Sequence, residues 1–151
     1  VLVALGGLGD TPPLDAWPAD PGLRWLVPAG GPRGPRIHAL PELDLEWPDA
    51  IASTDAFIGK PGYGSVANAA VHGTPFLFMR RGDWPEEPPL VDWTLAHARA
   101  LEIPRETLWA GDVRIPLEAL WALPARPRLE PTGAEEIAEG ILRLLEGRGR
   151  P

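Results

Sequence analysis

Residues 55–79 read DAFIGKPGYGSVANAAVHGTPFLFM, and this stretch decides the fold class. The apolar run at 55–59 predicts a buried strand, and a glycine-rich turn over 59–65 follows it. Residues 65–72 predict a helix that Gly73 closes, and residues 76–79 predict the next strand. A strand, a helix and a strand in direct succession predict two parallel strands of one sheet.

The alternation of strands and helices extends to the rest of the chain. Further strands are expected at 1–5, 24–27, 36–40 and 101–103, and further helices at 47–51, 90–100, 115–123 and 133–146. The last helix is expected to open with a capping box of Thr132 and Glu135. Since 151 residues suit one ordinary domain, we expect a single α/β domain with a mostly parallel sheet.

Composition excludes several classes of function. The net charge of -7 disfavours non-specific binding to nucleic acid or to anionic membranes. The chain contains no cysteine, so disulfides and thiolate chemistry are excluded. No apolar stretch approaches the roughly 18 residues of a membrane span and no signal peptide is recognisable, which makes the cytoplasm the expected compartment. Because Val1 lies directly in a strand-like run, we expect a further domain upstream.

The turn over 59–65 has the features of an anion site. It follows a strand and opens a helix, where backbone N–H groups and the helix dipole favour a phosphate. Gly62 and Gly64 let the backbone approach a ligand, and Ser65 offers a hydroxyl. Lys60 is the only lysine among 14 basic residues. The alternative is that the glycines merely allow strand and helix to pack closely, with Lys60 in solvent.

Two other turns fall at the same predicted sheet edge, where the carboxyl ends of parallel strands meet ligands. One is the turn at 6–11, in which Gly6 and Gly7 either approach a ligand or simply form a tight turn. On the helix after the central motif, Asn68 lies one turn from Ser65 and can reach a ribose hydroxyl. His72 is interpreted as the polar end of that helix.

The third turn, at 80–87, carries charges of both signs. Arg80, Arg81, Glu86 and Glu87 suit hydrogen bonding to a sugar or phosphate, and a solvated charged loop is the alternative. The three histidines, at 38, 72 and 97, have no metal-ligand spacing, and no carboxylate pair stands out for acid and base catalysis. We therefore name no catalytic residue and expect no metal. The seven tryptophans are expected in the core or over its edge.

The motif residues carry a resemblance to a known family. The segments 55–65, 73–81 and 86–88 together resemble the carboxyl-terminal nucleotide-sugar domain of GT-B glycosyltransferases. More closely, they are similar to the glycosyltransferase-like region on the amino-terminal side of plant-type L-arabinokinases. The likeness extends from the turn at Gly6 to the helix at 134–145, and the segment from Lys60 to Gly64 is its most specific part.

The resemblance implies a Rossmann-like half of a two-domain fold, with helices on both faces of the sheet and a donor such as a UDP-sugar in the cleft between halves. The diphosphate would lie over Gly64 and Ser65 and near Gly6 and Gly7. Arg80, Glu86 and Glu87 would face the sugar, with no metal or other cofactor. The acceptor site and the catalytic base would belong to an upstream domain, so this chain alone would bind rather than catalyse.

One position departs from the family pattern. The related enzymes carry a glutamate for the ribose hydroxyls where this chain has Asn68, and an amide is a weaker acceptor than a carboxylate. Two functions follow as hypotheses: the donor-binding domain of a glycosyltransferase that transfers a hexosyl group, or a non-catalytic regulatory or scaffolding module on the same fold. A sugar-nucleotide epimerase is a third, although no added catalytic carboxylate or histidine pair favours it.

Overall fold

The computed structural model describes residues 1–6, 11–82 and 84–148, and its core is one parallel sheet. Its strands are short and follow the apolar runs: β1 (Leu2–Ala4), β2 (Trp25–Val27), β3 (Ile37–Ala39), β4 (Phe57–Gly59), β5 (Phe76–Phe78) and β6 (Ala100–Glu102). The spatial order is β3-β2-β1-β4-β5-β6, and every pairing between these strands is parallel. The expected mostly parallel α/β sheet is confirmed.

The strand order defines where the chain changes direction. The first three strands run outward from the middle of the sheet to one edge, and the next three run from the middle to the other edge. This is the order of a Rossmann-like doubly wound sheet, in which ligands bind beyond the carboxyl ends of the strands at the reversal. Here the reversal lies between β1 and β4, where Ala4 pairs with Gly59.

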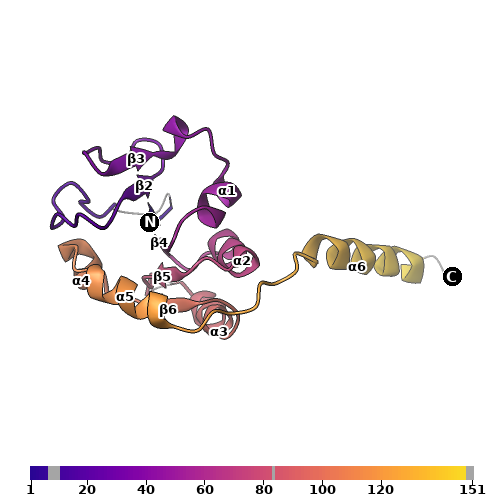
Figure 1. Cartoon of the computed structure of the whole chain (residues 1–151). Helices are drawn as coiled ribbons and strands as arrows, with labels where there is room; N and C mark the ends of the chain where they lie inside the picture. Colours follow the sequence, from indigo (N-terminus) through magenta and orange to yellow (C-terminus); the bar gives the residue numbers. More distant parts are fainter. Residues whose placement is uncertain (7–10, 83, 149–151) are drawn as a thin grey trace.

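Helices cover both faces of the sheet (Figure 1). One face carries α1 (Trp47–Ala52), α2 (Tyr63–His72) and α3 (Glu87–His97), and the other carries α4 (Arg105–Ala110) and α5 (Arg114–Ala122). A short 3-10 helix, η1 (Leu40–Glu42), follows β3. On the side of α4 and α5, the irregular segment over residues 11–24 adds Leu14, Trp17 and Leu23 to the core.

Aromatic packing fixes the centre of the helical layer that contains α2. The rings of Phe57 and Phe76 are stacked with centroids 4.9 Å apart, and Trp47 meets Phe57 edge-on at 5.9 Å. Phe57 and Phe76 are fully buried. Aromatic pairs of this geometry contribute about 0.5–1.5 kcal/mol beyond the area they bury. These pairs join β4 to β5 and to α1.

In the second half of the chain the bounds of one expected helix were wrong, and one helix was not expected. The helix expected at 90–100 begins at Glu87 and ends at His97, because Pro88 and Pro89 fit a first helical turn and Ala98 is already extended. Residue 100 then starts β6. The helix α4 was not predicted from the sequence, since its six residues are too few to establish a helical period.

The last helix, α6 (Gly133–Arg148), projects away from the rest of the molecule (Figure 1). Its apolar residues Ile137, Ile141 and Leu144 are each more than half exposed. The hydroxyl of Thr132 contacts the carboxylate of Glu136 at 2.6 Å instead of forming the expected pair with Glu135. Within the described residues, no helix combines the length and the apolar character needed to span a membrane.

Gly59 tests how tightly the centre of the sheet is packed. A Cβ atom at this position would lie 2.6 Å from Cζ of Phe57 and 3.0 Å from the carbonyl oxygen of Ala4. Because the Phe57 ring is fully buried, it cannot swing away. We predict that Gly59→Ala lowers the free energy of unfolding by about 1–3 kcal/mol, as overpacked cores do. Urea denaturation followed by circular dichroism measures the change, and unaltered stability would contradict this packing.

Candidate functional site

Two of the three candidate turns meet at the reversal of the sheet. Since Ala4 pairs with Gly59, the chain leaves β1 toward Gly6 and leaves β4 toward Lys60 at neighbouring points of the same edge. Gly6 has a φ of +70°, a conformation that a glycine adopts without strain. Gly7 lies outside the described residues. The position of Gly6 agrees with the expected site, and its contact with a ligand stays a prediction.

The amino terminus of α2 opens at this edge. Gly62 is the N-cap, and the first intrahelical bond runs from the N–H of Val66 to the carbonyl of Gly62 at 2.9 Å. The N–H groups of Tyr63, Gly64 and Ser65 precede that bond, in the turn where helical N–H groups lack an intrahelical acceptor. Ser65 is partly exposed there. This end of α2 therefore has the donors and the partial positive charge that an anion requires.

The glycines of the turn have different roles. Gly59 is needed for packing, because a side chain there would clash with Phe57. A Cβ atom on Gly64, in contrast, would meet no heavy atom within 4 Å. Close packing within the sheet thus accounts for Gly59 and not for Gly64. Open space above Gly64 is what the approach of a ligand to the backbone would require.

Lys60 and Arg81 bring positive charge to the same place. Lys60 is 8% exposed, so it does not project into solvent as the packing alternative supposed. One terminal nitrogen of Arg81 lies 3.4 Å from the position of a Cβ atom on Gly62, directly beside the N-cap of α2. Burial lowers the pKa of Lys60, and the charges of Arg81 and Arg105 lower it further. An anion among these cations would relieve their repulsion.

The Arg81 side chain is held by an aromatic ring. Its guanidinium carbon lies 4.3 Å from the centroid of Trp84, a cation–π distance. The Nε atom of Arg81 is buried and has no hydrogen-bond partner among the described residues. A buried donor without an acceptor costs about 1–3 kcal/mol, which makes a ligand oxygen here favourable.

The loop after β5 is shaped by Glu87. Its carboxylate accepts hydrogen bonds from the backbone N–H groups of Arg81 at 2.6 Å and of Gly82 at 3.1 Å, and the residue is 3% exposed. This buried carboxylate therefore positions the backbone that carries Arg81. A contact between Glu87 and a sugar stays a prediction, and in this structure the loop backbone occupies both oxygens.

Arg80 and Glu86 lie on either side of that loop. The Nε atom of Arg80 donates to Glu102 at 2.9 Å, and both side chains are largely solvent-exposed, so the pair contributes little to stability. Glu86 accepts a hydrogen bond from the hydroxyl of Tyr63 at 3.0 Å, and this bond raises the pKa of Tyr63. The expected contacts of Arg80 and Glu86 with a sugar stay predictions.

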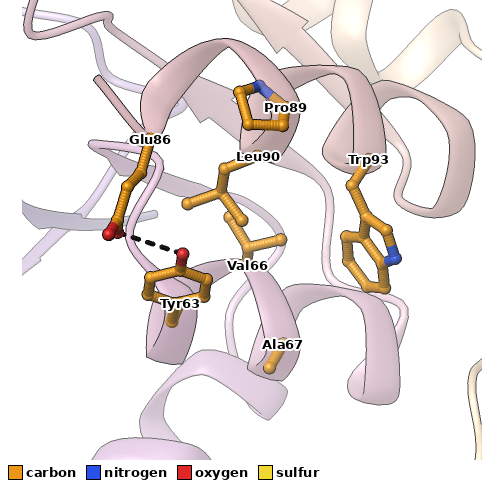
Figure 2. A pocket seen from close by; sticks show the side chains of 7 residues that line it. All are labelled: Tyr63, Val66, Ala67, Glu86, Pro89, Leu90 and Trp93. Atoms are coloured by element: carbon orange, nitrogen blue, oxygen red, sulfur yellow. Dashed lines mark hydrogen bonds between the residues drawn. The ribbon is translucent and has the colours of Figure 1, made fainter. Parts of the chain in front are cut away.

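A groove between α2 and α3 begins at this Tyr63–Glu86 bond (Figure 2). Its volume is about 340 Å³, and Figure 2 shows Val66 and Ala67 on α2 facing Leu90 and Trp93 on α3. Apart from the hydroxyl and the carboxylate at one end, the walls are apolar. This groove could not be predicted from the sequence, because its two walls come from two helices and only tertiary packing brings their side chains together.

The side chain of Asn68 makes a hydrogen bond within its own helix. Its side-chain nitrogen donates to the carbonyl of Gly64 at 2.7 Å, one turn toward the amino terminus. The amide oxygen is the remaining group that can accept a bond from a ribose hydroxyl. A glutamate could not make this bond to Gly64, because a carboxylate has no hydrogen to donate. The asparagine thus stabilises the first turn of α2, and its ribose contact stays a prediction.

Arg105 is the site residue that the sequence did not indicate. It is the first residue of α4, beyond the end of β6, and its charge contributes to the lowered pKa of Lys60. No motif marks it, and the preceding proline gives only a helix start. Among the described residues, no group of histidine, aspartate and glutamate side chains is placed to hold a metal ion.

Comparison with known proteins gives a partial likeness. The fold is that of a Rossmann-like α/β protein, as the strand order defines. No protein-family model matches the chain, and no solved structure matches it. The chain is similar to L-arabinokinase from Arabidopsis thaliana, with 38% identity over 68 residues. These residues are 45% of this chain and 6% of the Arabidopsis protein, so the chain spans a small part of that relative.

Gly64 offers a test that separates stability from binding. We predict that Gly64→Ala raises the free energy of unfolding by up to about 1 kcal/mol, because alanine favours a helix more than glycine does. The same change should weaken binding of inorganic pyrophosphate several-fold, since the methyl group would occupy the open space above the turn. Gly140→Ala in α6, which also meets no atom within 4 Å, is the matched control. Equal pyrophosphate affinity in all three proteins would contradict an anion site at Gly64.

Proposed function

We propose that this chain is the donor-binding domain of a GT-B-like glycosyltransferase and binds a nucleoside diphosphate sugar such as a UDP-sugar. The observation that carries the proposal is the amino terminus of α2, where Lys60 and Arg81 flank exposed backbone donors at the reversal of the sheet. A diphosphate suits this place, because its charges satisfy both the cations and the helix dipole.

Two further observations support a sugar-linked ligand. The relative from Arabidopsis thaliana is named for L-arabinose, a sugar, and the identity of 38% lies over a substantial part of this chain. The position of the site beyond β1 and β4 is where nucleotides bind in doubly wound sheets. The resemblance of the segment from Lys60 to Ser65 to the GT-B donor motif supports a diphosphate linked to a sugar as the ligand.

We assign donor binding to this chain and acceptor activation to another domain, because of the groups found at this edge of the sheet. The described residues supply donors and cations for a diphosphate, whereas the carboxylates of the edge are engaged by Arg80, Tyr63 and the loop backbone. A general base for the acceptor hydroxyl is therefore assigned to an upstream domain, as in two-domain enzymes of this kind. In this proposal the hexosyl group is transferred only when both domains enclose the donor.

Removing the lysine tests the proposal. We predict that UDP binds the unaltered chain and that Lys60→Ala weakens binding about tenfold or more, because a charge-assisted contact contributes about 1.5–3 kcal/mol. Isothermal titration calorimetry with UDP and UDP-glucose measures both affinities. Arg143→Ala is the matched control, because it removes one positive charge from an exposed ion pair on α6. Absent or equal heat for the unaltered chain and Lys60→Ala would refute the proposal.

The second candidate function, a non-catalytic regulatory or scaffolding module, is favoured by Asn68. Its bond to Gly64 serves the helix, in the place of the carboxylate that would hold a ribose. Under this hypothesis the nucleotide site is a weakened remnant, and restoring the carboxylate should recover affinity.

Substitutions at position 68 discriminate the two functions. For a donor site adapted to asparagine, we predict that Asn68→Glu leaves UDP affinity unchanged or lowers it, since the new carboxylate loses the bond to Gly64 and repels the phosphate. Asn68→Ala, which removes the bond without adding charge, separates these two causes. A gain of tenfold or so in the glutamate variant, measured by the same calorimetry, would favour the degenerate module.

A further inference from the structure

The groove between α2 and α3 is a cavity with a different lining from the proposed diphosphate site (Figure 2). Val66 and Leu90, the most buried of its lining residues, are 1% and 8% exposed and belong to the hydrophobic core. The floor of the groove is therefore rigid, since core side chains are closely packed. Its volume of about 340 Å³ lies at the lower end of the range of small-molecule sites, roughly 300–1,000 Å³. A compound of one or two rings fits this space.

Aromatic rings stand at the two ends of the groove. Figure 2 shows Tyr63 at one end and Trp93 at the other, with the aliphatic side chains between them. The Tyr63 ring meets Trp84 edge-on with centroids 6.0 Å apart, and the Trp93 ring is stacked on His97 at 4.5 Å. Each ring is thus held by an aromatic neighbour. Because the rings are held before a ligand arrives, binding costs little ordering of side chains.

One end of the groove is polar. The hydroxyl of Tyr63 donates to the carboxylate of Glu86 at 3.0 Å, and Glu86 is exposed. A carboxylate has about four lone-pair sites, so it can accept a bond from a ligand hydroxyl beside the bond from Tyr63. Its negative charge repels an anionic ligand. Apolar walls with an acceptor at one end are typical of a site that orients a neutral ligand.

We propose that this groove binds a neutral aromatic alcohol. The ring system of the ligand lies between Tyr63 and Trp93, and its hydroxyl donates to the carboxylate of Glu86. Aromatic rings in edge-to-face or offset contact attract one another beyond the effect of the area that they bury. The two rings of the groove therefore favour an aromatic ligand over a saturated one of the same size.

This ligand is distinct from a nucleotide sugar. Tyr63 belongs to both sites, because its N–H group lies in the first turn of α2 while its side chain lines the groove. An aromatic ligand in the groove therefore lies beside the anion site. The inference goes beyond the proposed nucleotide-sugar function and does not depend on it, because the groove is formed without a nucleotide.

Three probes test the chemistry of the groove. β-Naphthol carries one hydroxyl on two fused rings and is uncharged at neutral pH. β-Decalol keeps the hydroxyl and loses the aromatic rings, and β-naphthoate replaces the hydroxyl with a carboxylate. We expect β-naphthol to bind with a Kd of about 0.1 mM, as a ligand of this size can. The other two probes should bind about threefold more weakly or worse. Amide NMR titration of the whole chain measures each affinity and identifies the backbone groups that shift.

Two variants test the position of the ligand. Ala67 is exposed and lines the groove, so Ala67→Trp should fill it and weaken β-naphthol about tenfold or more. Ala96→Trp is the matched control, because Ala96 is an exposed residue of α3 outside the groove lining. Glu86→Gln should weaken β-naphthol about threefold and strengthen β-naphthoate, because it removes the negative charge and keeps an acceptor. Thermal melts establish that each variant folds.

The outcomes decide the proposal. Amide shifts along α2 and α3, with binding lost in Ala67→Trp and kept in Ala96→Trp, would support it. Absent binding of β-naphthol, equal affinity for β-decalol, or shifts confined to another face would overturn it. If the unaltered chain is a dimer by sedimentation and the groove amides shift on dilution, a second copy covers the groove and the assignment of an aromatic alcohol is wrong. UDP affinity is measured separately, so failure of β-naphthol would leave the nucleotide-sugar function standing.

Discussion

Strand β4 (Phe57–Gly59) is the constraint on which the rest of the molecule depends. It pairs with β1 on one side and β5 on the other, and its three residues are buried. Gly59 must lack a side chain, because the Phe57 ring and the carbonyl of Ala4 occupy that space. This packing fixes the point at which the chain leaves the sheet toward Lys60 and α2. The direction of α2, and with it the placement of its free backbone donors, follows from the same strand.

In the candidate site, some side chains support the local structure and others supply positive charge. Glu87 is buried to hold the loop, Trp84 supports the guanidinium of Arg81, and Asn68 supports the first turn of α2. Lys60 and Arg81 bring positive charge to this edge, in a chain whose net charge is -7. Local concentration of positive charge against an overall negative field favours an anion at one place and repels polyanions elsewhere. Burial lowers the pKa of Lys60, and the neighbouring positive charges lower it further.

Much of the fold was predictable from the sequence, because buried strands appear in it as short runs of apolar residues. The runs around Leu2, Leu26, Phe57 and Phe76 each form a strand, and the turn before Ser65 opens a helix as expected. The helix α2 begins two residues earlier than predicted, at Tyr63, because glycines carry no periodic signal. The start of helix α3 was predicted three residues too late, because Pro88 and Pro89 in its first turn were interpreted as part of the preceding loop. The short α4 was missed altogether, and Arg105 with it.

By itself, the sequence determined the class of fold, the place of the glycine-rich turn and the unusual lysine, since each is a local pattern of residue types. Only the tertiary structure decided that Lys60 is buried, that Gly59 serves packing while Gly64 does not, and that the charge of Arg105 acts on Lys60, 45 residues earlier in the chain. The physical reason is that parallel pairing aligns the exits of β4, β5 and β6, which are far apart in sequence. Residues become neighbours there through backbone hydrogen bonds of the sheet, and no spacing within the chain encodes that proximity.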